Sequence, residues 1–178
     1  MYIRQETAGD LDAIRRINLE AFAQHPFSRQ TEHLIVEALR ASGTLELSLV
    51  AVSDEDVVGH IAFSPAAVGQ TATGWFLVGP VAVLPEHQRR GIGTALVEAG
   101  LEGMRARSAL GCVLVGDPAF YGRFGFRACK DAIYEGVPAE YLLSLSFAGE
   151  EPAGVVSADP AFSVPPAEDS PHTGDGAG

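Results

Sequence analysis

Residues Gln88 to Gly93 read QRRGIG, and they stand between two apolar segments of different character. The segment before them, Val78 to Leu84, is typical of a strand, and the segment after them, Thr94 to Arg107, is typical of a helix. A turn between such a strand and such a helix collects the free backbone N–H groups and the positive end of the helix dipole at one spot. A spot of this kind binds phosphate groups.

Two glycines and two arginines suit this turn to a diphosphate. Gly91 and Gly93 have no Cβ, so a diphosphate can approach the main chain, while Arg89 and Arg90 add positive charge at the rim. A dinucleotide-binding GxGxxG motif would need a third glycine where Leu96 stands, and a P-loop would need a GK[ST] sequence that the turn lacks. The turn therefore indicates a phosphorylated cofactor outside both common nucleotide-binding motifs.

The turn resembles the Q/RxxGxG/A signature of the GNAT superfamily of N-acetyltransferases. A second segment, GDPAFYGRFGF from Gly116 to Phe126, is similar to the Y-x-x-x-G-F element near the C-terminal end of GNAT domains. It follows another strand-like run, Gly111 to Val115. The resemblance covers most of residues 1–147 and is strongest from Val78 to Phe126. It implies acetyl-CoA as the co-substrate.

The resemblance implies an α/β (α+β) GNAT fold, with a mixed central sheet of about six to seven strands, splayed in the middle and flanked by helices. Pro80 agrees with a splayed sheet, because a proline in a central strand removes a ladder hydrogen bond and is tolerated where the neighbouring strand has diverged. In GNAT folds the pantetheine arm enters there, and the resemblance assigns the backbone pairing to Val81, Ala82 and Val83. A simple edge strand is the alternative interpretation.

Acetyl transfer from acetyl-CoA needs protein groups that bind the pyrophosphate, stabilise the negative charge on the thioester oxygen and stabilise the leaving thiolate. The resemblance assigns the pyrophosphate of acetyl-CoA to the turn and the first helical residues, namely Gln88, Arg89, Arg90, Gly91, Ile92, Gly93 and Thr94. A backbone N–H near Val81 would stabilise the negative charge on the thioester oxygen. Tyr121 fits the tyrosine of Y-x-x-x-G-F and is predicted as the general acid for the thiolate, because an unperturbed pKa near ~10 keeps it protonated. The alternative is a packed aromatic ring.

Several residues are candidates for the general base, and the sequence does not choose among them. His60 lies in the strand-like run Val57 to Ser64, where the alternation of side chains can direct it toward the cofactor, although a structural histidine is the commoner case. Glu20, His25 and Glu32 stand on or between the first two predicted helices, a region that forms the acceptor wall in GNAT folds. Water is the remaining candidate.

The flanking segments predict one domain, residues 1–162, followed by a tail of proline, glycine and acidic residues, 163–178, that is predicted to be disordered. Thr7 to Asp10 reads as a capping box before the first helix. The predicted helices lie near 11–22, 34–42 and 94–107, and the predicted strands lie near 2–4, 47–53, 57–64, 75–84, 111–115, 127–129 and 141–147.

The composition argues against several classes of partner and cofactor. The net charge of -11 argues against nucleic acid as a partner. The two cysteines, Cys112 and Cys129, have no metal-ligand spacing, so no metal is expected, and the lack of an apolar N-terminal segment predicts a cytoplasmic protein without membrane contact. The expected partner is a primary amine on a small molecule or a protein, with a homodimer possible. The rival hypotheses are a non-catalytic acyl-CoA sensor and a nucleotide-binding domain.

Overall fold

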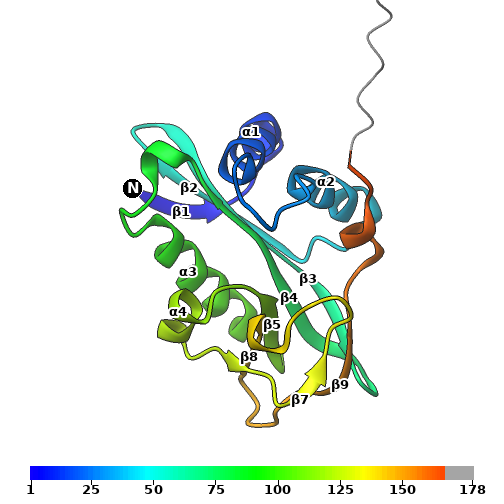
Figure 1. Cartoon of the computed structure of the whole chain (residues 1–178). Helices are drawn as coiled ribbons and strands as arrows, with labels where there is room; N and C mark the ends of the chain where they lie inside the picture. The colour runs from blue at the N-terminus through cyan, green and yellow to red at the C-terminus, as the bar shows by residue number, and fades with distance from the viewer. Residues whose placement is uncertain (167–178) are drawn as a thin grey trace, which may run out of the picture.

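The structure, a computed structural model, describes residues 1–166 as a sheet with helices on both of its faces (Figure 1). Residues 167–178, which are most of the predicted tail, lie outside the described residues. The strands are β1 (Tyr2–Gln5), β2 (Leu47–Ser53), β3 (Asp56–Val68), β4 (Thr71–Val83), β5 (Gly111–Val115), β6 (Arg127–Ala128), β7 (Asp131–Ile133), β8 (Leu142–Ser146) and β9 (Ala153–Ser157). The α-helices are α1 (Leu11–Phe22), α2 (Glu32–Ser42), α3 (Ile92–Ala106) and α4 (Pro118–Tyr121). The 3-10 helices are η1 (Ala8–Asp10), η2 (Pro85–His87), η3 (Gly122–Phe124), η4 (Ala139–Tyr141) and η5 (Pro160–Ser163).

The strands are ordered β1-β2-β3-β4-β5-β8-β6, and β9 pairs with both β3 and β7. Each neighbouring pair along the main path is antiparallel except β4 and β5, which are parallel because α3 connects them as a crossover helix. The predicted mixed α/β sheet flanked by helices is therefore confirmed. Within residues 1–166 it has nine strands, more than the six to seven expected, because the short strands β7 and β9 were not predicted.

Local sequence signals set several of these boundaries. The Asp10 carboxylate accepts a hydrogen bond from the Thr7 main-chain N–H (2.7 Å), which is the bond that the predicted capping box requires of Asp10, and it also accepts one from the Thr7 hydroxyl (2.9 Å). Gly43 ends α2 in the left-handed conformation with φ +75°. Between β2 and β3, Asp54 and Glu55 have φ of +50° and +71°, which gives the hairpin its two-residue turn. The bounds of β2 and β5 match the predicted strands residue for residue.

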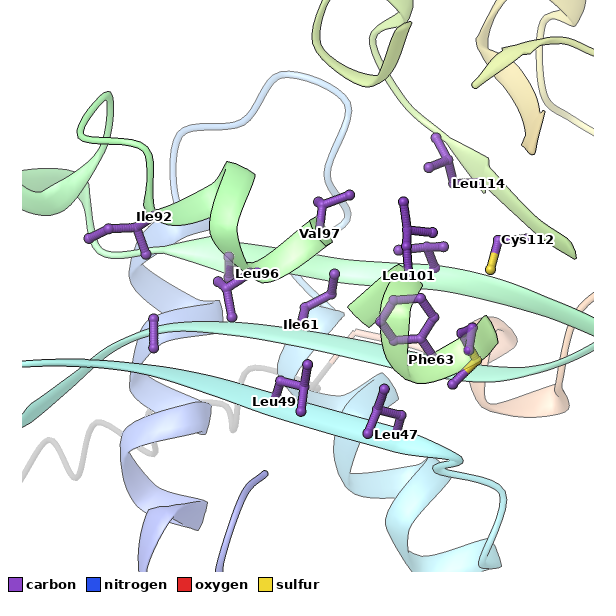
Figure 2. Packing of buried hydrophobic residues seen from close by; sticks show 14 of the residues in the cluster. Leu47, Leu49, Ile61, Phe63, Ile92, Leu96, Val97, Leu101, Cys112 and Leu114 are labelled. Atoms are coloured by element: carbon purple, nitrogen blue, oxygen red, sulfur yellow. The ribbon is translucent and has the colours of Figure 1, made fainter. Parts of the chain in front are cut away.

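The largest part of the core lies between α3 and one face of the sheet (Figure 2). Leu96 of α3 is fully buried there, as are Ile61 and Phe63 of β3. Gly100 lets the helix approach closely, since a Cβ built at this position would lie 2.4 Å from the Phe63 ring. Because α3 is packed so tightly on β3, the position of its first turn relative to the sheet is fixed.

The helices α1 and α2 cover the other face of the sheet (Figure 1). Ile14 of α1 and Val36 of α2 pack there against Val50 of β2 and Ala62 of β3. Near the C-terminal end of the described residues, Ala161 of η5 packs on α2. Both faces of the central strands are thus buried.

Candidate functional site

Strands β4 and β5 separate in the middle of the sheet. They pair from Trp75 opposite Gly111 to Leu77 opposite Val113, and no pairing between them is found for the rest of β4, from 78 to 83. The register between β3 and β4 also shifts at this place, between Ile61 and Phe63 of β3. Pro80 lies in this separated part, so the predicted divergence is confirmed. The edge-strand interpretation is wrong, because β4 lies between β3 and β5.

The separated part of β4 directs alternate backbone groups toward the side from which β5 has departed. Leu84 N–H donates to Val58 O of β3 (3.0 Å), so the backbone groups of Ala82 also face β3. Val81 and Val83 therefore face the opposite side, and the Val83 carbonyl accepts a hydrogen bond from the Gln88 side chain (3.0 Å). Val81 thus directs its N–H and carbonyl away from β3, Val83 directs its N–H there while its carbonyl is bonded to Gln88, and Ala82 directs its groups to β3.

The turn after β4 presents a run of free amides. No described residue accepts a hydrogen bond from the main-chain N–H groups of residues 89–94, and the first helical bond of α3 runs from Ala95 N–H to Gly91 O (3.0 Å). Gln88 differs from its neighbours, because its N–H donates to Pro85 O (3.3 Å) and its side chain to Val83 O. Gln88 therefore fixes the shape of the turn, and residues 89–94 supply the free donors.

The turn is open and positively charged. Arg89 and Gly91 both have positive φ, +59° and +82°, which folds the chain tightly before α3. A Cβ built on Gly91 would meet no described atom within 4 Å, so no side chain plugs this face. Arg89 and Arg90 are exposed, and no described carboxylate lies within 4.0 Å of either guanidinium. Free amides, the positive end of a helix dipole and two exposed arginines thus lie together at this turn, and these are the features to which anions bind in other proteins.

The helix α4 borders the start of α3. A Cβ on Gly93 would lie 3.7 Å from the Phe120 ring and 3.9 Å from the Val83 side chain, which places α4 and the end of β4 beside the turn. Tyr121 packs its ring on the Gly116 backbone and edge-on to Phe120, with ring centroids 4.8 Å apart. This arrangement brings the predicted Tyr121 and the predicted turn into one region.

The chemical state of Tyr121 suits a donor. Burial raises the pKa of its hydroxyl to about 12, so the group is protonated throughout the neutral range. The hydroxyl makes no hydrogen bond with another described residue. The ring is packed as an ordinary core aromatic, and the hydroxyl is free to donate, so the role of general acid stays a prediction.

His60 is a structural histidine. It has no exposed surface, the Asn18 side-chain amide donates to Nδ1 (3.2 Å), and Nε2 lies 2.9 Å from Ser48 Oγ. Burial lowers the pKa of His60 to about 4, so the ring is neutral at neutral pH. The chain of contacts continues from Ser48 to the Glu6 carboxylate, which is paired with Arg40 (2.9 Å). Sequence reasoning missed these partners, which carry no motif.

The other candidate bases lie on or near the connection between α1 and α2. Glu20 is exposed and lies 3.9 Å from Arg16 on the same helix. His25 is exposed, with the Phe22 ring centroid 5.7 Å away, and Glu32 accepts a hydrogen bond from the Ser28 hydroxyl (2.6 Å). No hydrogen bond or ion pair between described residues joins these three candidates to β4 or to Tyr121.

Two further features of residues 1–166 bear on the kind of site. No group of three or more histidine, cysteine, aspartate or glutamate side chains in this range is arranged to hold a metal ion. None of the helices in this range has the length and apolar content needed to span a membrane.

The chain is similar in sequence to known N-acetyltransferases. The sequence profile of the Acetyltransferase (GNAT) family matches residues 11–126. The uncharacterized N-acetyltransferase YhbS of Escherichia coli K12 is 36% identical over 127 residues, which are 71% of this chain and 73% of that protein. YjhQ of the same strain, also an uncharacterized N-acetyltransferase, is 33% identical over 135 residues, which are 74% of this chain and 71% of that protein.

Solved structures with the same fold were crystallised with coenzyme. A GNAT family acetyltransferase from Brucella melitensis, in complex with acetyl-CoA, is 43% identical with a TM-score of 0.81, and the match covers 90% of this chain and 97% of that chain. YhbS from Escherichia coli, in complex with CoA, is 29% identical with a TM-score of 0.83, and the match covers 92% of each chain.

Proposed function

Because this chain belongs to the GNAT acetyltransferase family, we propose that it is an N-acetyltransferase that moves an acetyl group from acetyl-CoA to a primary amine of a small molecule or a protein. The observation that carries the proposal is the run of free amides at residues 89–94, beside the place where β4 leaves β5. The acetyl-CoA and CoA in the crystals of two relatives support the same ligand here.

The residues present fit acetyl-CoA. The amides of 89–94 would hold the pyrophosphate, with Arg89 and Arg90 adding charge from the rim. The backbone groups of Val81 and Val83, which face away from β3, would pair with the amides of the pantetheine arm. Acetyl-CoA, when bound, supplies an activated thioester for attack by the amine.

Val81 and Tyr121 would stabilise the negative charges that develop on the thioester oxygen and on the leaving sulfur during acetyl transfer. The Val81 N–H would donate to the thioester oxygen as it gains negative charge, in a position held rigidly by the pairing of β4 with β3. Tyr121 would donate a hydrogen bond to the leaving sulfur, which departs as a thiolate and takes a proton from solvent. Because the pKa of Tyr121 is about 12 and that of a thiol is ~8.5, full proton transfer is uphill, and hydrogen-bond donation is the role that we propose.

The amine must lose a proton as it forms the new bond to carbon. We propose that water takes this proton, because both ring nitrogens of His60 already have partners. A lysine-like amine with a pKa of ~10.4 is neutral less than about once in a thousand molecules at pH 7. The reaction is therefore expected to accelerate with pH across the neutral range, as the neutral fraction of the amine grows.

The test is incubation of the full chain with acetyl-CoA and a panel of primary amines, while free thiol is followed with time. We expect thiol release that depends on the presence of an amine. Tight binding of acetyl-CoA with no amine that increases thiol release would support the sensor hypothesis. Absence of acetyl-CoA binding would overturn the proposal itself.

A further inference from the structure

Arg123 of η3 is held in one orientation by its neighbour Phe120. Its guanidinium stacks 4.9 Å above the Phe120 ring, and its Nε donates to the Phe120 carbonyl (3.0 Å). No described carboxylate lies within 4.0 Å of this guanidinium. Its two terminal nitrogens are therefore left to bind an anion from outside, in a geometry that is already fixed.

Phe120 contacts both Arg123 and the first turn of α3. The far carbon of its ring is 3.7 Å from the position of a Cβ on Gly93, while Arg123 covers the face of the same ring. Arg123 thus stands about one aromatic ring away from the free amides of residues 89–94. A ligand that places one phosphate on those amides and carries a second phosphate would bring the second one toward Arg123.

We propose that Arg123 binds the phosphate on the 3′ oxygen of the CoA ribose, an assignment that rests on the proposed function. CoA carries its pyrophosphate on the 5′ carbon and a further phosphate on the 3′ carbon of one ribose. That sugar separates the two anionic groups, and in the protein the first turn of α3 lies at the edge of the Phe120 ring while Arg123 lies over its face. Arg123 therefore makes the site prefer CoA to its analogue without the 3′-phosphate.

Of the charged residues around it, Arg123 is the one placed to bind the 3′-phosphate. It lines a surface hollow of about 410 Å³ together with Glu98, Glu102 and Arg105 of α3. The two glutamates repel a phosphate, so binding depends on an arginine. Arg105 instead stacks on Phe147 (4.5 Å), and it lies three turns along the helix from Gly93. Arg105 is thus a matched control, with the same charge in the same hollow but far from the first turn of α3.

The experiment is isothermal titration of CoA and of dephospho-CoA into the wild-type chain, R123Q and R105Q. We expect the wild type and R105Q to bind CoA about tenfold more tightly than dephospho-CoA, as a charge-assisted hydrogen bond implies. R123Q should bind the two ligands equally, with unchanged affinity for dephospho-CoA. A further variant, R123K, should keep part of the preference for CoA over dephospho-CoA, because lysine keeps the positive charge but lacks the paired N–H donors of the guanidinium.

Three results would overturn the assignment. Equal affinities in the wild type would mean that the 3′-phosphate is not recognised, and a preference retained in R123Q would assign it to another residue. Equal weakening of both ligands in R123Q would place Arg123 on the pyrophosphate. If the wild type binds neither ligand, the proposed function fails as well, which distinguishes that failure from the first three results.

Discussion

Replacement of Gly91 by alanine separates the cost of the backbone from the binding of coenzyme. Gly91 has φ +82°, and an added Cβ would meet no described atom within 4 Å, so backbone strain is the main cost to the folded chain. An L-residue in this conformation costs about 1 to 2 kcal/mol. For a chain of this size such a loss lowers the melting temperature by about 2 to 8 °C.

The same change should weaken coenzyme binding for a different reason. The strain is present with and without ligand, so by itself it leaves the dissociation constant unchanged. The new methyl group, however, projects from the open face of the turn, and any relaxation of φ turns the amides of 89–94 away from the ligand. Loss of one hydrogen bond to a charged phosphate costs about 1.5 to 3 kcal/mol, which raises the dissociation constant at least about tenfold.

Gly43 provides the control, because it has φ +75° and an added Cβ there also meets no described atom. Gly43 ends α2, away from α3 and β4. We expect Gly43→Ala and Gly91→Ala to lose similar amounts of stability in thermal unfolding, while only Gly91→Ala loses affinity for acetyl-CoA in titration calorimetry. Equal affinity in the two variants would refute the assignment of the turn as the diphosphate site.

Three other predictions concern catalysis, pH and packing. Tyr121→Phe should lower kcat by about tenfold to hundredfold, with little change in coenzyme affinity, if its hydroxyl donates to the leaving sulfur; a wild-type kcat would leave Tyr121 a packing residue. Burial lowers the pKa of His60 from 6.5 to about 4, so the unfolded chain takes up a proton first as the pH falls. The free energy of unfolding should therefore fall by about 3 kcal/mol from pH 6.5 to pH 4. Denaturant titrations of the wild type and His60→Gln at several pH values check this. If the free energy of unfolding depends on pH equally in both proteins, the prediction is wrong. Gly100→Ala places a Cβ 2.4 Å from the Phe63 ring and should lower the free energy of unfolding by about 1 to 3 kcal/mol, measured by thermal unfolding. Phe63→Leu, added to Gly100→Ala, should recover part of this loss. If the effects of the two substitutions simply add, the contact does not cause the loss.

The fold could be predicted where its signals are local. Periodicity placed β2 and β5 at their observed bounds, because each is a short apolar run between turn residues. The resemblance implied the separation of the strand before the turn from the next one, and Pro80 agreed with it, because proline is tolerated where a neighbouring strand has diverged. The short strand β9 escaped prediction, since most of its residues are exposed and it depends on pairing with β3, far away in sequence.

The candidate site was predictable in part for the same reason. The turn 88–94 and Tyr121 belong to contiguous motifs, so each could be named from its own segment. The environment of His60 could not, because its partners Asn18 and Ser48 come from α1 and β2 and carry no pattern of their own. The role that we propose for Arg123 could not be named from the second motif, since its position relative to the start of α3 depends on how α4 packs.

The most direct test of the central claim is an amide NMR titration of the ¹⁵N-labelled chain with CoA. The claim is that the free amides of residues 89–94 hold the diphosphate and that Val81 and Val83 face the pantetheine arm. We predict that the amide resonances of these residues shift most, while the resonance of Gly43 at the end of α2 stays unchanged. Binding of CoA with no shift at residues 89–94 would contradict the account.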